Sequence, residues 1–370
     1  MSTTPIRVMD GGLGTLLTSP PHSIAFDTRT PLWSSHLLLS ESGEGEIRKA
    51  QLSFVEAGAD LLLSATYQAS FEGFAATKIS RESDGVGEVE AGTCMRRAVG
   101  IARECLSIGI DKKDRGRRGS VVLSLGAYGA TMVPSTEYSG SYDESHRTMD
   151  QLRDWHLRRL GVFLPNSSRD ERTRCWDDVD MVAFETLPLA NEILAAREAM
   201  GSLSTEILKP FWVSCVFPGE DNVLPDGSSV KDMVEAMLGT SLESVNESQV
   251  TPTPDAIGLN CTKVERVESL VLEMETAVND LLQNLAHKGQ SWPALVVYPD
   301  GTKGEVYNTT TKEWEMVGVS ANNKTPWDEQ IFAIVERARE RGRWKEIIVG
   351  GCCKATPGDI SRLRRRVDSL

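Results

Sequence analysis

Residues 256–285 read AIGLNCTKVERVESLVLEMETAVNDLLQNL, a short apolar run followed at once by a long segment with helical periodicity. The run Ala256–Cys261 is almost continuously apolar, which is typical of parallel strands buried on both faces. In Val264–Leu285 the apolar residues recur at spacings of three and four, which predicts an amphipathic helix. A strand that leads directly into a helix is the repeating unit of α/β proteins.

The same strand-then-helix pattern occurs eight times along the chain. The expected strands are Ile6–Asp10, Ala59–Thr66, Val121–Ala127, Met181–Thr186, Phe211–Phe217, Ala256–Cys261, Ala294–Tyr298 and Ile347–Cys352. Eight such units predict a closed (β/α)₈ barrel of the TIM type, formed as a single domain over residues 1–370. An open doubly wound sheet is the alternative, and it usually carries a glycine-rich phosphate loop after its first strand. The segment Asp10–Thr15 lacks the G-x-G-x-x-G spacing, so a dinucleotide site has little support.

The length of the chain predicts enlarged loops. A barrel of this type typically needs about 250 residues, and this chain has 370. The polar segments Ile79–Gly92, Pro165–Asp178 and Asp300–Pro326 are rich in turn formers and are the expected insertions. The last helix should begin at Thr356, which caps it, with Pro357 in the first turn and Asp359 three residues after the cap.

Composition and charge exclude several classes of partner. The formal net charge is −13, from 40 basic and 53 acidic residues, so nucleic acid and anionic membranes are not expected to bind. No apolar run is long enough for a signal peptide or a membrane span. The seven cysteines are odd in number, which favours a reducing compartment over a disulfide framework and predicts a cytoplasmic protein.

Three of the seven cysteines fall where a barrel places its chemistry. Active sites of such barrels lie at the C-terminal ends of the strands. Cys261 ends the sixth strand and Cys352-Cys353 ends the eighth, with only one strand expected between them. Adjacent cysteines on a regular strand would point to opposite faces, so Gly350 and Gly351 are expected to let the backbone leave β geometry there.

Three converging thiolates would suit a zinc ion with an open fourth position. The structural alternative is that Cys352-Cys353 is a pair of small buried residues, since free cysteine is among the most buried residue types. The zinc hypothesis requires the three sulfurs to lie within roughly 5 Å of one another, given Zn–S bonds of about 2.3 Å. The remaining cysteines, Cys94, Cys105, Cys175 and Cys215, are interpreted as packing residues.

Five short motifs together resemble the homocysteine S-methyltransferase family. They are Asp10-Gly11-Gly12, the segment Ser64–Ser70, Phe184-Glu185-Thr186, Gly258-x-Asn260-Cys261 and Gly350-Gly351-Cys352-Cys353. They occur in order over almost the whole chain, and the last two at this separation are highly specific. The segment Ser64–Ser70 is more similar to the sulfonium-using branch than to the betaine-using branch.

The resemblance implies an activity and a set of site residues. It implies a zinc-bearing barrel in which Cys261, Cys352 and Cys353 are ligands and the thiol of L-homocysteine is the exchangeable fourth. A methyl group would pass to that thiol from a sulfonium donor, S-methylmethionine or S-adenosylmethionine, and give methionine. The substrate-binding residues implied are Asp10, Gly11, Thr66, Glu185 and Asn260. Members that end soon after the second cysteine motif tend to be monomers, and we expect the same here.

Other interpretations of these residues stay open. Asp10 and Glu185 could cap neighbouring helices instead of contacting substrate, and Thr66 could serve packing. Tyr67, Tyr128 and Trp33 are candidate walls for a cationic donor. The barrel could instead be a non-catalytic, zinc-stabilised module that binds an amino acid as a sensor, or it could hold no metal. His146 and His156 are interpreted as surface residues.

Overall fold

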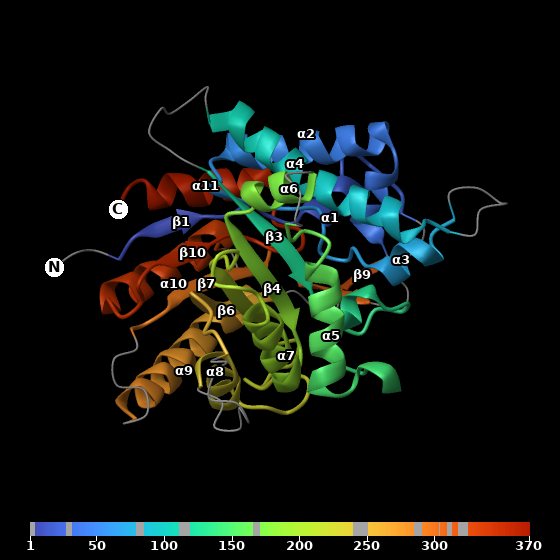
Figure 1. Ribbon diagram of the computed structural model, residues 1–370. Coiled ribbons are helices and arrows are strands. Elements are labelled where there is room, and N and C mark those ends of the chain that lie inside the picture. The colour runs from blue at the N-terminus through green and yellow to red at the C-terminus, as the bar shows by residue number, and fades with distance from the viewer. Residues whose placement is uncertain are drawn as a thin grey trace.

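The computed structural model describes residues 4–26, 32–78, 85–110, 119–165, 171–239, 251–284, 291–302, 304–308, 313–316 and 325–370. Eight parallel strands form a barrel in the order β1-β10-β7-β6-β5-β4-β3-β2 (Figure 1). These strands are β1 (Ile6–Val8), β2 (Leu61–Leu63), β3 (Ser120–Gly126), β4 (Met181–Leu187), β5 (Phe211–Cys215), β6 (Ala256–Lys263), β7 (Ala294–Asp300) and β10 (Ile347–Val349). The predicted fold is confirmed and all eight predicted strands are present, although β1, β2, β5 and β10 are shorter than predicted and β4, β6 and β7 extend further.

The barrel closes between its first and second strands. Met9 forms a parallel bridge with Leu61, and the backbone N–H of Asp10 donates to the carbonyl of Leu61 at 3.1 Å. The N–H of Asp60 donates to the carbonyl of Val8 at 2.6 Å. Closure brings the C-terminal ends of β1 and β10 next to those of β2 and β3, so that motifs far apart in the sequence meet at one rim.

Helices surround the strands (Figure 1). They are α1 (Leu13–Thr18), α2 (Glu41–Ala57), α3 (Phe71–Ala76), α4 (Glu88–Ile110), α5 (Met149–Leu160), α6 (Glu171–Asp178), α7 (Ala190–Gly201), α8 (Val230–Leu238), α9 (Val264–Gln283), α10 (Trp327–Arg341) and α11 (Pro357–Val367). Short 3₁₀ helices are η1 (Trp33–Leu39), η2 (Tyr128–Thr131) and η3 (Glu144–His146). None of the helices in the described ranges is both long and apolar enough to cross a bilayer.

Two apolar cores explain why the strands are almost continuously hydrophobic. Inward residues such as Met9, Trp212 and Ile348 fill the inside of the barrel. Outward residues such as Val121 and Leu123 pack with the helices in a second, larger core. Each strand therefore buries both of its faces, as the apolar runs predicted.

The helix predictions hold, with small differences at the ends. α9 begins at Val264 as predicted and ends at Gln283; Leu285, the predicted last residue, lies outside the described residues. In α11 the hydroxyl of Thr356 accepts from the N–H of Asp359, and the side chain of Asp359 accepts from the N–H of Thr356, so the cap is a full capping box.

The predicted insertions contain more secondary structure than expected. The segment Pro165–Asp178 includes helix α6, and Asp300–Pro326 includes an antiparallel hairpin of β8 (Glu305–Asn308) and β9 (Glu313–Met316). α4 begins at Glu88, inside the predicted loop Ile79–Gly92. α6, β8 and β9 are short and polar, so their periodicity is weak in the sequence.

Candidate active site

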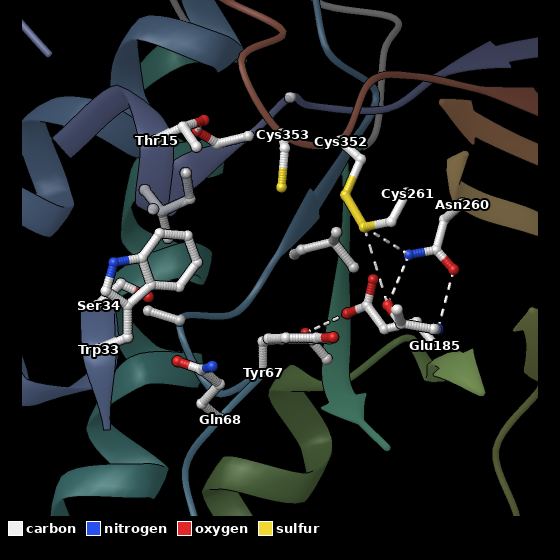
Figure 2. Close-up of a pocket in the computed structure, with 18 of the residues that line it drawn as sticks. Thr15, Trp33, Ser34, Tyr67, Gln68, Glu185, Asn260, Cys261, Cys352 and Cys353 are labelled. Carbon is white, nitrogen blue, oxygen red and sulfur yellow. Dashed lines mark hydrogen bonds between the residues drawn. A yellow bond between two sulfur atoms is a disulfide. The ribbon is translucent and has the colours of Figure 1, made fainter. Parts of the chain in front are cut away.

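A cavity of about 310 Å³ opens at the C-terminal ends of the strands (Figure 2). It is lined by residues from the ends of β1, β2, β3, β4, β6, β7 and β10, together with loop residues from the β3–α5 connection and the β8–β9 hairpin. Among the predicted site residues, those that line it are Asp10, Gly11, Glu185, Asn260, Cys261, Cys352 and Cys353. This is the rim at which barrel enzymes carry their chemistry.

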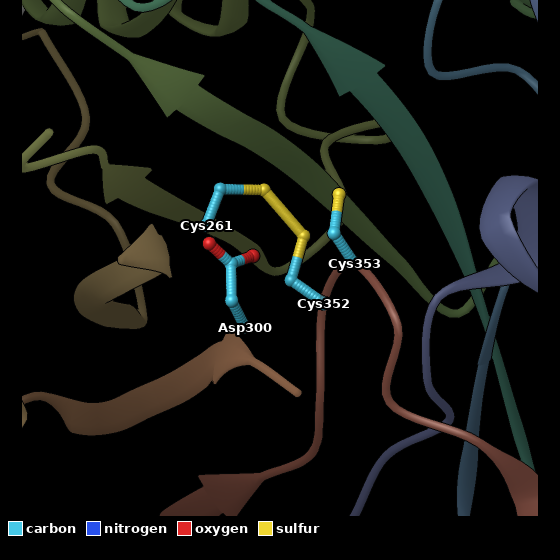
Figure 3. A group of neighbouring side chains, drawn as sticks. All are labelled: Cys261, Asp300, Cys352 and Cys353. Atoms are coloured by element: carbon cyan, nitrogen blue, oxygen red, sulfur yellow. A yellow bond between two sulfur atoms is a disulfide. The ribbon is translucent and has the colours of Figure 1, made fainter. Parts of the chain in front are cut away.

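The three predicted cysteines meet at one point of this cavity. The sulfurs of Cys261, Cys352 and Cys353 and a carboxylate oxygen of Asp300 all lie within 4.8 Å of one another (Figure 3). Cys261 and Cys352 are joined as a disulfide, and Cys353 is a free thiol. Sulfurs that are 91 residues apart in the sequence thus converge on one place.

The turn after β10 sets the positions of Cys352 and Cys353. The strand ends at Val349, because the next two residues leave regular β geometry. A Cβ on Gly350 would lie 2.7 Å from the carbonyl oxygen of Asp10, and a Cβ on Gly351 would lie 2.2 Å from the side chain of Ala355. The glycines are therefore required for close approach. The left-handed residue of the turn is Lys354, with φ 60°.

Asp300 was not predicted, although the rule that found the cysteines applies to it. It is the last residue of β7, so its side chain reaches the same rim. The N–H of Cys352 donates to the carbonyl of Pro299 at 2.8 Å, and the N–H of Gly301 donates to the carbonyl of Cys353 at 2.7 Å. These two bonds hold Asp300 beside the cysteine pair.

The charges around the cysteine cluster favour a bound cation. Burial raises the pKa of Asp300 to about 7, and its Oδ1 atom is buried with no hydrogen-bond partner among the described residues. Burial and then the charges of Asp300 and Glu137 raise the pKa of the Cys353 thiol, and a hydrogen bond from Tyr138 only partly offsets this. Once the Cys261–Cys352 disulfide is reduced, three thiolates and one carboxylate oxygen would form a donor set that suits a thiophilic divalent metal such as zinc.

Two predicted acids face the cavity next to the cysteines. Glu185 is 4% exposed, and the hydroxyl of Ser124 donates to its Oε1. Burial raises the pKa of Glu185 to about 7, against the opposing effects of Ser124, Tyr298 and Arg159. Asp10 is 1% exposed; its Oδ2 accepts from the N–H of Leu63 at 2.9 Å, and its Oδ1 has no partner among the described residues. Burial and then the charge of Glu185 raise the pKa of Asp10.

Gly11 and Thr66 differ in how they relate to the cavity. Gly11 lines it, and a Cβ there would lie 2.4 Å from the carbonyl oxygen of Ala355, so only glycine fits. Thr66 is fully buried and does not line the cavity. Its hydroxyl donates to the carbonyl of Ser124 at 2.7 Å, which ties the end of β2 to β3. The geometry gives Thr66 a structural contact, as the packing alternative anticipated.

Asn260 lines the cavity but is fully buried beside Cys261. Its Nδ2 atom donates to the Cys261 sulfur at 3.2 Å and to the Thr186 hydroxyl at 2.7 Å. Both Thr186 and Cys261 have left-handed backbone conformations, with φ of 63° and 47°. Such values are uncommon outside glycine and mark positions that the surrounding structure holds in place.

Aromatic side chains form much of the remaining wall. Trp33 and Tyr67 lie across the pocket from the cysteines in Figure 2. Tyr138 and Trp314 line the cavity as well and were not predicted. Tyr128, the third predicted wall residue, does not line it.

Of the two histidines predicted to lie on the surface, His146 is partly exposed and His156 is buried. The ring of His146 stacks on the Tyr128 ring with centroids 3.9 Å apart. His156 is fully buried, and its Nε2 lies 3.0 Å from the carboxylate of Glu192. A single polar residue on a helix does not reveal which face is covered, so this burial had no local signal.

Comparison with known proteins identifies the family of the chain. A sequence model described as "Homocysteine S-methyltransferase" matches residues 7–367. "Homocysteine S-methyltransferase 4" of Zea mays is 32% identical over 366 residues, which cover 97% of this chain and 89% of the relative. "Selenocysteine Se-methyltransferase" of Brassica oleracea var. italica is also 32% identical, over 98% of this chain and 89% of its own.

Solved structures share the fold. The oxidized form of the homocysteine methyltransferase MmuM from Escherichia coli has a TM-score of 0.68 and 23% identity, and the match covers 98% of this chain and 96% of that one. The metallated form of the same protein gives a TM-score of 0.66 at the same coverage. With a family match across nearly the whole chain and relatives above 30% identity, the protein belongs to the homocysteine S-methyltransferase family of enzymes.

Proposed function

We propose that the protein transfers a methyl group from a sulfonium donor to the thiol of L-homocysteine and forms methionine. The observation that carries this proposal is the convergence of three sulfurs and a carboxylate within 4.8 Å at the active rim of the barrel. We further propose that residues 1–370 act as one domain, because the site draws on elements from β1 to the turn after β10.

We propose zinc as the metal, held by Cys261, Cys352 and Cys353. When bound, zinc would keep the substrate thiol deprotonated near neutral pH and so supply a nucleophilic sulfur. The three cysteines serve as ligands only in their reduced form, because a disulfide sulfur carries no thiolate. Asp300 lies at the same point and completes a donor set of three sulfurs and one oxygen in the absence of substrate.

Glu185 and Asp10 are proposed to bind the ammonium group of homocysteine. Both carboxylates are buried and face the cavity, and Asp10 keeps one oxygen without a partner among the described residues. A substrate cation would offset the burial of their negative charge, which is otherwise unfavourable. Gly11 would let the amino-acid part approach the backbone closely.

The remaining walls are proposed to hold the methyl donor, either S-methylmethionine or S-adenosylmethionine. A sulfonium cation is attracted to aromatic faces, and Trp33 and Tyr67 line the side opposite the cysteines. In the transfer, the homocysteine sulfur forms a bond to the methyl carbon as the bond from that carbon to the sulfonium breaks. The electron pair stays with the donor sulfur, which leaves as a neutral thioether. The protein's task is alignment, which can supply several kcal/mol.

The experiment is a methyl-transfer assay on reduced, zinc-loaded protein with S-methylmethionine, S-adenosylmethionine and betaine in parallel. We expect methionine to form with one of the two sulfonium donors and not with betaine, and zinc to be present at about one ion per chain. L-selenocysteine is a second acceptor to include, since relatives of about 30% identity are named for it. Binding of homocysteine without turnover of any donor would favour the sensor alternative instead.

A further inference from the structure

We propose that Asn260 is a positioning residue of the cysteine cluster and not a contact for substrate. Its amide holds the ends of β4 and β6 in left-handed conformations and donates a hydrogen bond to the sulfur of Cys261 (Figure 2). This inference rests on the proposed metal site, because it concerns how one of the proposed ligands is oriented. It replaces the prediction that Asn260 is a substrate-binding residue.

The amide of Asn260 has no bonding capacity left for a ligand. Its Oδ1 accepts from the backbone N–H of Thr186 at 2.9 Å and from the hydroxyl of Ser214 at 2.9 Å. Its Nδ2 donates to the Thr186 hydroxyl at 2.7 Å and to the Cys261 sulfur at 3.2 Å. A primary amide accepts two hydrogen bonds and donates two, so all four are used. A substrate could bind this side chain only by breaking one of them.

The orientation of the amide follows from its partners. A backbone N–H can only donate, so the atom that faces Thr186 N must be the amide oxygen. The nitrogen must then face the Thr186 hydroxyl and the Cys261 sulfur. The N–H···S bond is therefore fixed by chemistry and not by a choice between two equivalent orientations.

Thr186 and Cys261, the two residues to which the amide nitrogen donates, lie where the pairing of neighbouring strands becomes irregular. Pairing of β4 with β5 is irregular between Phe184 and Leu187, and pairing of β6 with β7 is irregular between Asn260 and Lys263. Thr186 and Cys261 carry the left-handed φ values within these irregular stretches. Threonine is β-branched and disfavours this conformation, so the bonds from Asn260 must hold it. One side chain thus spans both irregularities and aims the Cys261 sulfur into the rim.

The same amide is connected to the proposed substrate carboxylate. The Ser214 hydroxyl, which donates to Asn260, lies 2.6 Å from the hydroxyl of Tyr298. Tyr298 in turn is hydrogen bonded to Glu185. A continuous chain of side chains therefore runs from Glu185 to the Cys261 sulfur through Asn260. Partners of this kind behind metal ligands typically affect metal affinity by about 10–100-fold.

Cobalt(II) titration of the reduced, full-length protein tests this role, with Asn260→Asp as the main variant. The substitution keeps both acceptor contacts and removes both donors. If the added negative charge were the only effect, cobalt would bind more tightly. We expect the opposite, because the N–H···S bond is lost: the affinity for cobalt should fall by about tenfold or more, and the thiolate-to-cobalt absorption band should shift. Thr186→Val removes the hydroxyl that accepts from Asn260 and itself donates to the Cys261 sulfur at 3.9 Å, but it leaves the shorter N–H···S bond in place and should weaken binding less. Asn222→Asp is the matched control, since its amide bonds Glu273 outside the cluster.

The outcomes separate this inference from the proposed function. If the wild-type protein shows no thiolate-to-cobalt band, the proposed metal site itself is wrong, and the inference is overturned with it. If the wild type shows the band and Asn260→Asp binds cobalt as tightly with the same spectrum, only the positioning role is overturned. If Asn260→Asp does not fold, Thr186→Val tests the positioning role instead. An unchanged cobalt affinity and spectrum in that variant would contradict the proposal that hydrogen bonds from Asn260 hold the ends of β4 and β6 together.

Discussion

The two ends of this barrel treat acidic side chains in opposite ways. At the N-terminal end, Asp60 accepts from the N–H of Val8 at 2.8 Å and pairs with Arg364 at 2.9 Å. Asp180 likewise accepts from the N–H of Val121 at 2.8 Å and pairs with Arg103 at 2.5 Å. Each of these acids precedes a strand and ties it to its neighbour.

At the C-terminal rim, Asp10, Glu185 and Asp300 form no ion pair with a basic side chain among the described residues, although Asp10 also accepts from a backbone N–H. Asp10 and Asp300 each leave one carboxylate oxygen unbonded among the described residues, and Glu185 has hydroxyl partners with Arg159 as a more distant charge. The pKa values of all three are raised by burial. The acids at the N-terminal end are therefore ion-paired and stabilise the fold. The acids at the C-terminal rim are not ion-paired, and a bound metal or a substrate ammonium would stabilise their negative charge.

The largest effect should come from the cysteine cluster. Cys353→Ser removes a thiolate ligand, so the homocysteine thiol would no longer be held deprotonated. A free alkyl thiol with a pKa of ~8.5 is only about 3% ionised at pH 7, so methyl transfer should fall by at least about 30-fold. Methionine formation and bound zinc are measured together. Cys175→Ser, at a cysteine buried in α6, should retain both; equal losses in the two variants would contradict the assignment.

The next effect concerns Glu185. Glu185→Gln removes the charge proposed to bind the ammonium, so the KM for homocysteine should rise by about 10–100-fold, the size of one charge-assisted hydrogen bond. The thermal stability should not fall, because a buried carboxylate is replaced by a neutral amide. Steady-state kinetics and a melting curve test both parts. A lower Tm with an unchanged KM would mean that Glu185 is structural.

The protonation of Glu185 should also make the affinity for homocysteine depend on pH, with a smaller effect than the substitution. The pKa of Glu185 is raised to about 7, so the carboxyl gains a proton as the pH falls through 7 and loses its attraction for an ammonium. Homocysteine affinity should then weaken by about tenfold per pH unit below that value. Arg159, Ser124 and Tyr298 face the same group and remain in Glu185→Gln, whereas the pKa of Asp10 should be lower in the variant because the charge of Glu185 no longer raises it. The ratio of wild-type to variant affinity between pH 5.5 and 8.5 therefore reports the loss of the Glu185 charge, and a flat ratio would refute the assignment.

The smallest effect on turnover should come from the opposite end of the barrel. Asp180→Ala removes the bonds to Arg103 and to Val121, so the free energy of unfolding should fall by about 1–3 kcal/mol. The KM and kcat should stay at wild-type values, because the substitution lies at the far end of β4 from the cavity. Urea denaturation and kinetics give the two numbers. A change in kcat or KM without a loss of stability would contradict the claim that the acids at the N-terminal end serve only the stability of the fold.

Residues of the site could be predicted from the sequence where they lie at the predicted C-terminal end of a strand. Cys261, Cys352 and Cys353 follow from two motifs and from one rule about where barrels place their chemistry. Asp300 obeys the same rule and was missed only because the end of β7 was set two residues too early. Tyr138 and Trp314 lie on loops, where no periodicity marks the residues that turn inward.

Sequence alone determined the eight strand-and-helix units, because each apolar run and each helical face is a local pattern that any reader of the chain can find. Tertiary structure decided which side chains meet. Thr66 bonds a neighbouring strand, His156 is buried, and Asn260 lines the cavity with an amide that is already fully bonded to Thr186, Ser214 and Cys261. The physical reason is that closure of the barrel and its strand irregularities depend on contacts between residues far apart in the chain, and local periodicity carries no record of them.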